Sequence, residues 1–280
     1  MKPKAFAKSS QLGRKYAMLT AYDALTSGIL ESAGIDFILV GDSVGMVLLG
    51  YPNTAQVTME EMLHHAKAVR RGAPKSYILG DLPKKGVEKG PRQALESAKR
   101  FLGEAGMNAV KIEWRKDCLQ ATELMARHKI PVQGHVGLTP QAAKNKAGFK
   151  MQGKDSSSAE KIFKQALAFE KAGASSLLLE YIPWELGKMI TDAVKLPVIG
   201  IGAGPYCDGQ VLVFQDLIGL FDSFKPKFVK RYAETAGTIK QAVAGYIQDV
   251  RRGAFPGFSH SFSMDSGELK KLSKKILGKP

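Results

Sequence analysis

Five titratable side chains stand at or near the ends of short apolar runs in this sequence of 280 residues. They are Asp42, Asp81, Glu113, His135 and Glu180. An acid in such a position is often only a helix cap or a turn former. The first three close successive runs, however, and neighbouring parallel strands would bring them together. Clustered carboxylates repel one another unless a cation compensates, and oxygen ligands favour Mg²⁺ or Mn²⁺. We therefore predict a divalent metal site whose ligands are Asp42, Asp81 and Glu113.

Lys111 and Glu113 lie two residues apart on one predicted strand, so their side chains point to the same side. A lysine inside a protein is costly unless it is paired. The two side chains could form a structural ion pair, or Lys111 could hold a substrate carboxylate or a developing enolate. His135 is similarly open to two interpretations, a satisfied core histidine or a substrate contact.

Glu180 ends the sixth apolar run, after the residues Ser-Leu-Leu-Leu. An ordinary salt bridge to a nearby lysine would explain it. Across the site from the metal, partial burial would instead suit it to be a general base. We favour the base.

The apolar runs are nearly continuous rather than alternating, which is typical of parallel strands covered by helices. We expect strands at 17–22, 37–42, 77–82, 109–113, 131–136, 176–180, 197–202 and 210–214. Helical patterns separate nearly all of them, which favours an α/β fold, a single (β/α)₈ TIM-type barrel domain over 1–280. A long helical pattern over 227–252 predicts a C-terminal helical extension, and 264–280 is a basic tail that could be flexible.

Helix boundaries are marked by local signals. Thr58 with Glu61, and Ser157 with Glu160, have the spacing of capping boxes. Pro91 suits the first turn of a helix that runs to about Gly106.

The chain carries 41 basic and 26 acidic side chains, a net charge of +15. No nucleic-acid-binding motif accompanies this charge, so we expect a solvated basic surface that attracts anionic small substrates, and no nucleic-acid partner. No apolar run approaches the roughly 20 residues that would span a bilayer. Two cysteines without ligand spacing and the lack of a secretory signal predict a cytoplasmic protein.

Six sequence blocks resemble the ketopantoate hydroxymethyltransferase family. They include VGDSVGM, VKIE, PVQGHVGLTPQ and IGIGAGPYCDGQVLVFQDLIGL, and the resemblance runs from about Tyr16 to Phe262. The resemblance implies a (β/α)₈ barrel that is Mg²⁺-dependent and forms large homo-oligomers, commonly decamers. It also implies transfer of a hydroxymethyl group from methylenetetrahydrofolate to 3-methyl-2-oxobutanoate, which gives ketopantoate for pantothenate and coenzyme A synthesis.

The resemblance assigns roles to individual residues. It places Asp42, Asp81 and Glu113 at the metal, and it makes Glu180 the general base. It implies contacts with the keto acid from Asp42, Ser43, Asp81 and Lys111, to which we add His135 from its position.

The sequence departs from the family pattern near the predicted mouth of the barrel. The departures are Leu82–Pro91, Trp114–Arg115, Tyr181 and Tyr206. They leave the metal and keto-acid residues intact and would bear on folate binding, loop closure and substrate choice. Two alternatives therefore stay open: a metal-dependent lyase or aldolase on another α-keto acid, and a non-catalytic paralogue that binds an acidic metabolite.

Overall fold

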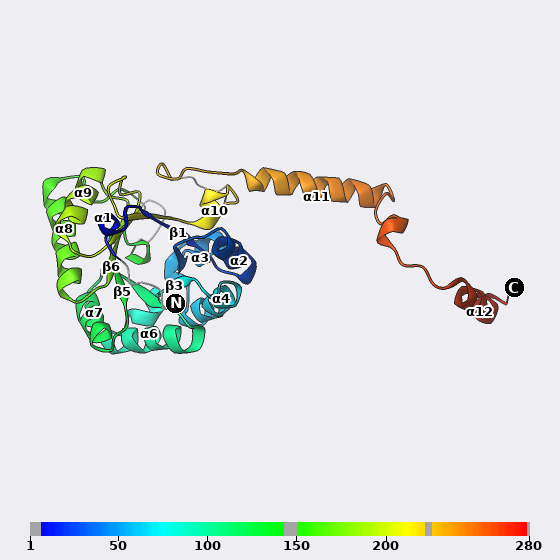
Figure 1. Cartoon of the computed structure of the whole chain (residues 1–280), viewed down its shortest axis with the longest axis horizontal. Helices are drawn as coiled ribbons and strands as arrows, with labels where there is room; N and C mark the ends of the chain where they lie inside the picture. The colour runs from blue at the N-terminus through cyan, green and yellow to red at the C-terminus, as the bar shows by residue number, and fades with distance from the viewer. Residues whose placement is uncertain (1–6, 143–149, 222–225, 279–280) are drawn as a thin grey trace. The chain divides into compact units, whose positions relative to one another are not determined.

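Eight parallel strands form a closed barrel in sequence order in this computed structural model, which describes residues 7–142, 150–221 and 226–278 (Figure 1). The strands are β1 Tyr16–Thr20, β2 Phe37–Val40, β3 Tyr77–Asp81, β4 Ala109–Glu113, β5 Val132–Gly137, β6 Ser176–Glu180, β7 Val198–Ile201 and β8 Gly209–Leu212. The predicted barrel is confirmed, and each predicted strand is present. The second strand ends before Asp42, which instead lies in the turn that follows β2.

Helices connect the strands and surround them (Figure 1). Those up to the end of the barrel are α1 Ser9–Leu12, α2 Ala24–Ser32, α3 Val44–Val47, η1 Thr54–Gln56, α4 Met59–Gly72, α5 Lys84–Val87, α6 Pro91–Ala105, α7 Cys118–Arg127, η2 Pro140–Ala142, α8 Ser156–Lys171, α9 Trp184–Ala193 and α10 Phe214–Leu217. Within the described parts of the chain, no helix has the length and apolar character needed to cross a membrane.

One of the two predicted capping boxes is correct. The Thr58 hydroxyl accepts a hydrogen bond from the backbone N–H of Glu61, and the Glu61 carboxylate accepts one from the backbone N–H of Thr58. The second prediction is wrong, because Asp155 and not Ser157 caps α8. Its carboxylate accepts the Ser158 N–H at 2.9 Å. A better acceptor two residues earlier therefore takes the cap position.

The chain divides into two compact units, Met1–Tyr232 and Ala233–Pro280. The barrel lies wholly in the first unit, so a single domain over 1–280 stays a prediction. The second unit contains α11 Thr235–Arg251, η4 Phe258–His260 and α12 Ser266–Leu277. The helix expected over 227–252 therefore starts later than predicted. The tail expected over 264–280 forms α12, capped by Asp265, and its last two residues lie outside the described part of the chain.

The barrel interior changes character from one end to the other. Side chains alternate along each strand, so every second residue points inward. The inward positions form an apolar cluster across the strands: Tyr16, Met18, Phe37, Leu39, Leu79, Ala109, Leu178, Ile199 and Val211. The last inward positions of β3 to β6 carry the polar groups Asp81, Lys111, Glu113, His135 and Glu180. The apolar layers thus form a floor beneath a charged layer at the carboxyl ends of the strands.

Two outward glycines set the distance between strands and helices. A Cβ atom on Gly80 would lie 2.8 Å from the Phe101 ring of α6, and one on Gly134 would lie 2.5 Å from the Phe169 ring of α8. Both rings are fully buried. Close packing of these helices against β3 and β5 therefore depends on glycine at the two positions.

Candidate active site

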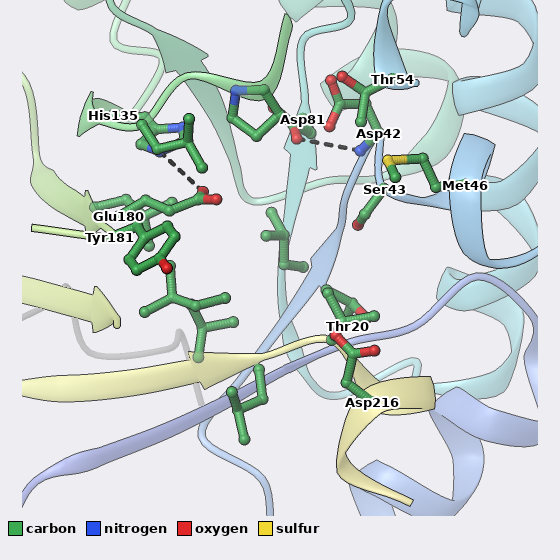
Figure 2. A pocket seen from close by; sticks show the side chains of 18 of the residues that line it. Thr20, Asp42, Ser43, Met46, Thr54, Asp81, His135, Glu180, Tyr181 and Asp216 are labelled. Atoms are coloured by element: carbon green, nitrogen blue, oxygen red, sulfur yellow. Dashed lines mark hydrogen bonds and ion pairs between the residues drawn. The ribbon is translucent and has the colours of Figure 1, made fainter. Parts of the chain in front are cut away.

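The strand register brings the predicted site residues together. Asp81 of β3 is aligned with Lys111 of β4, and Glu113 of β4 is aligned with His135 of β5. Glu180 is aligned with Gly137, the residue that ends β5. All these polar side chains line one pocket at the carboxyl ends of the strands, where Asp42 and Ser43 also lie (Figure 2). The barrel fold therefore places the predicted site residues close together.

Lys111 is the central cation of the pocket. Its Nζ lies 2.9 Å from Asp81 Oδ1 and 3.9 Å from Glu113 Oε1, and its side chain is only 4% exposed. Burial lowers the pKa of Lys111, but the negative charges of Asp81, Glu113 and Asp42 outweigh it and raise the pKa above its ordinary value. Lys111 is therefore a permanent cation whose main partner is Asp81.

Asp42 is held next to Asp81 by the backbone. The Asp42 N–H donates to Asp81 Oδ2 at 3.1 Å. Burial first, and then the negative charge of Asp81, raise the pKa of Asp42 well above its usual range. The charge of Lys111 offsets this only in part. The two carboxylates therefore lie in a place where a further positive charge would be stabilising.

Gln141 is a member of the site that the sequence interpretation did not identify. Its Nε2 donates to Asp42 Oδ2 and to the carbonyl of Leu82, both at 2.9 Å. Its backbone N–H donates to Glu113 Oε2 at 3.1 Å. Gln141 thus orients two of the predicted metal ligands. Its signal in the sequence was the Thr-Pro-Gln turn after the fifth strand.

Glu113 has one oxygen without a donor. Oε1 is buried and accepts no hydrogen bond from the described residues, and His135 Nδ1 lies 3.6 Å from it. Burial raises the pKa of Glu113 well above its ordinary value. Among residues 7–142, 150–221 and 226–278, no three His, Cys, Asp or Glu side chains are arranged to hold a metal ion. The set of three ligands therefore stays a prediction.

His135 connects the central cluster to Glu180. Its Nδ1 lies 3.3 Å from Lys111 Nζ. Its Nε2 lies 3.2 Å from Glu180 Oε2 (Figure 2). The second contact has the distance of an ion pair but not the angle of a good hydrogen bond. Burial, and then the charge of Lys111, lower the pKa of His135, which favours the neutral ring. Because Nδ1 faces an ammonium donor, the single ring proton belongs on Nε2, on the side of Glu180.

Ser43 begins α3 at the rim of the pocket. Its hydroxyl lies 2.8 Å from the hydroxyl of Tyr22, a fully buried side chain. Burial raises the pKa of Tyr22 above its ordinary value, so the phenol keeps its proton. The Ser43 hydroxyl is thereby held at the rim of the pocket, next to Asp42.

The apolar wall of the pocket comes from β7, β8 and the residues that follow them. It is formed by Ile201, Val211, Leu212, Val213, Phe221, Pro226 and Phe228. Asp216 and Thr20 also lie on this side, across from His135 and Glu180 (Figure 2). The sequence interpretation did not single out Asp216.

Of the positions that depart from the family pattern, Tyr181 lines the pocket. The Trp114 ring instead packs edge-on against Phe169, with ring centroids 5.6 Å apart. The Tyr206 ring lies against Trp184, with ring centroids 5.5 Å apart. Neither ring lines the pocket or its charged wall, which is formed by Asp42, Asp81, Lys111, Glu113, His135 and Glu180.

A titratable cluster at the carboxyl ends of barrel strands is the arrangement of an enzyme active site. Solved structures share the fold. They include phosphonopyruvate hydrolase in complex with oxalate and Mg²⁺, with a TM-score of 0.58, 14% identity and 97% of each chain covered. Another is 2,3-dimethylmalate lyase of the PEP mutase/isocitrate lyase superfamily, with a TM-score of 0.57 and 15% identity over 98% of this chain and 95% of that one.

Closer relatives define the family. A sequence model of ketopantoate hydroxymethyltransferase matches residues 1–258. A 3-methyl-2-oxobutanoate hydroxymethyltransferase of Thermus thermophilus is 50% identical over 250 residues, 89% of this chain and 95% of the relative. That of Clostridium kluyveri is 46% identical over 270 residues, 96% of each. The chain belongs to the ketopantoate hydroxymethyltransferase family, and the predicted family and enzyme class are confirmed.

Proposed function

We propose that this protein transfers a hydroxymethyl group from methylenetetrahydrofolate to 3-methyl-2-oxobutanoate, forming ketopantoate. The observation that carries the proposal is the charged wall, in which two aspartates, a lysine and a glutamate converge at the strand ends of a member of this family. An α-keto acid needs a cation for its two oxygen groups and a base for the proton on its third carbon, and this wall has both.

Glu180 is the proposed base. It takes the C3 proton of the keto acid, which leaves an enolate. Water hydrolyses the methylene bridge of methylenetetrahydrofolate, so both C–N bonds break, tetrahydrofolate leaves and the one-carbon unit is freed as formaldehyde. The enolate carbon bonds to the formaldehyde carbon, and the proton held by Glu180 goes to the new hydroxyl oxygen. His135 Nε2 lies 3.2 Å from Glu180 Oε2, so the His135 ring borders the proposed base. Lys111 places a fixed positive charge on the side of the pocket where the enolate oxygen develops.

A Mg²⁺ ion fits the same wall. Asp42 and Asp81 would hold it directly, because Mg²⁺ in proteins often takes one or two carboxylates and completes its shell with water and substrate. Glu113, whose buried Oε1 accepts no hydrogen bond from the described residues, would reach it through water. Mn²⁺ could replace it. The ion, when bound, would supply Lewis-acid stabilisation of the enolate.

The basic charge of the chain fits two anionic substrates. A net charge of +15 favours encounter with a keto acid and with folate. We keep the cytoplasm as the proposed location. We also propose that the protein forms a homo-oligomer, because one stripe of α11 exposes apolar side chains that a second subunit could cover. These are Ile239, Val243, Tyr246, Ile247 and Val250.

An omission assay tests the proposed function. Ketopantoate should form only when 3-methyl-2-oxobutanoate, methylenetetrahydrofolate and Mg²⁺ are all present, and EDTA should abolish it. Keto-acid turnover without folate would instead support the lyase or aldolase. Mg²⁺-dependent binding without turnover would support a non-catalytic paralogue.

A further inference from the structure

Asp216 is an acid in the pocket that the proposed chemistry does not use. It lies on α10, which follows β8, and it lines the pocket across from His135 and Glu180 (Figure 2). It does not cap its helix, because the residue before α10 is Val213 and no side chain caps that end.

The carboxylate of Asp216 has free acceptor positions. No described residue donates a hydrogen bond to it or forms an ion pair with it. Burial raises the pKa of Asp216 to about 6, and the positive charge of Arg231 offsets this only in part. A partly buried carboxylate without donors is costly, so a ligand that brings donors would be stabilised there.

The apolar side chains near Asp216 favour a ligand with a planar and partly apolar ring. Val213, Phe221, Pro226 and Phe228 line the same pocket, and the Phe221 N–H donates to the carbonyl of Gln215, the residue before Asp216. The Phe228 ring is held edge-on against Tyr181, with ring centroids 5.3 Å apart. A fused two-ring system with one planar ring could pack among these side chains with one polar edge toward Asp216.

The two proposed substrates differ in what they could offer to this acid. The keto acid has a carboxylate and a keto oxygen and no N–H donor, so Asp216 would repel it toward Lys111. The pterin of folate has two adjacent donors on one edge, the ring N3–H and the 2-amino group. A carboxylate matches such a pair with two parallel hydrogen bonds.

We propose that Asp216 binds the N3–H and 2-amino edge of the pterin ring of methylenetetrahydrofolate. The inference rests on the proposed function. N5, which carries the one-carbon unit, lies on the other ring of the pterin. Anchoring the amino edge at Asp216 therefore directs the reactive end across the pocket toward Glu180, with the keto acid between them.

Direct binding of tetrahydrofolate to Asp216→Asn tests the proposal. Calorimetry should show affinity weakened by roughly ten- to a hundred-fold, the loss of a charge-assisted donor pair. The control Asp192→Asn, an exposed acid on α9 paired with Lys188, should bind as the wild type does. Unchanged affinity in Asp216→Asn would overturn the proposal.

A folate analogue without the 2-amino group gives a second measurement. The wild type should bind it more weakly than tetrahydrofolate, whereas Asp216→Asn should lose little more. Equal affinity of the wild type for the two ligands would overturn the proposal without any variant. An equal loss in both proteins would do so as well.

Failure of the inference can be separated from failure of the proposed function. The wild type should exchange the C3 proton of the keto acid for deuterium with Mg²⁺ and without folate, because this step needs no pterin. A wild type that neither exchanges this proton nor forms ketopantoate would refute the proposed function. A wild type that turns over, beside an Asp216→Asn protein with unchanged folate affinity, would refute the role of Asp216 alone.

Discussion

The two walls of the pocket differ in whether their charged side chains have partners within the protein. On the charged wall the central cation is paired within the protein, because Lys111 Nζ lies 2.9 Å from Asp81 Oδ1. On the apolar wall Asp216 has no hydrogen-bond or ion-pair partner among the described residues. Charges that pair within the protein stabilise the arrangement of the site before the substrate binds. An unpaired carboxylate instead has oxygen atoms that can accept hydrogen bonds from a ligand. Removing the Lys111 charge should therefore destabilise the protein, whereas removing the Asp216 charge should stabilise it.

Lys111→Met should have the largest effect. It leaves Asp81 and Glu113 buried without their cation, and breaking a buried ion pair costs about 3–5 kcal/mol. Urea denaturation at pH 7.5 should show this loss, and turnover should disappear. A variant as stable as the wild type would contradict the assignment of Lys111 as the cation on which the charged wall depends.

Glu180→Gln should reduce catalysis without unfolding the protein. A positioned general base contributes about 10²- to 10⁴-fold, so kcat should fall by that factor. Glu180 lies at the edge of the cluster and its side chain is 15% exposed, so stability should change little. Normal turnover would remove Glu180 as the base.

Gln141→Leu should weaken the charged wall by an intermediate amount. It removes both donors on Nε2 and leaves Asp42 Oδ2 and the Leu82 carbonyl without them. A buried acceptor left unsatisfied costs about 1–3 kcal/mol, which chemical denaturation can resolve. The KM for the keto acid should also rise, since Asp42 loses its orientation. Unchanged stability and KM would mean that Gln141 only fills space.

Asp216→Asn should have the smallest effect, and one of opposite sign. The pKa of Asp216 is raised by burial to about 6, above the value of about 3.9 in an unfolded chain. Between these values the folded state binds more protons, so the contribution of this group to stability falls as the pH rises. The variant should therefore have a higher Tm than the wild type at pH 7.5 and a similar Tm at pH 4. A lower Tm at pH 7.5 would show that the protein itself needs this charge.

The sequence predicts the charged wall better than the apolar one for a physical reason. Asp81, Lys111, Glu113, His135 and Glu180 lie on strands, where alternation decides which side chains face inward and register decides which meet. The eight apolar runs therefore led to both the barrel and the cluster.

Gln141 and Asp216 lie instead on η2 and α10, elements of three and four residues. Such short turns have no period from which the direction of a side chain can be inferred. Their roles depend on which groups the barrel brings opposite them. The cap of α8 was also misplaced, since Asp155, Ser157 and Ser158 are all plausible caps until the backbone is known.

Proton exchange on the keto acid tests the central claim most directly. In D₂O with Mg²⁺ and no folate, NMR should show that the wild type replaces the C3 proton of 3-methyl-2-oxobutanoate with deuterium. Glu180→Gln should slow this exchange by at least about 100-fold, the lower end expected for a lost general base. Equal exchange in the two proteins would contradict the claim that Glu180 on the charged wall removes this proton.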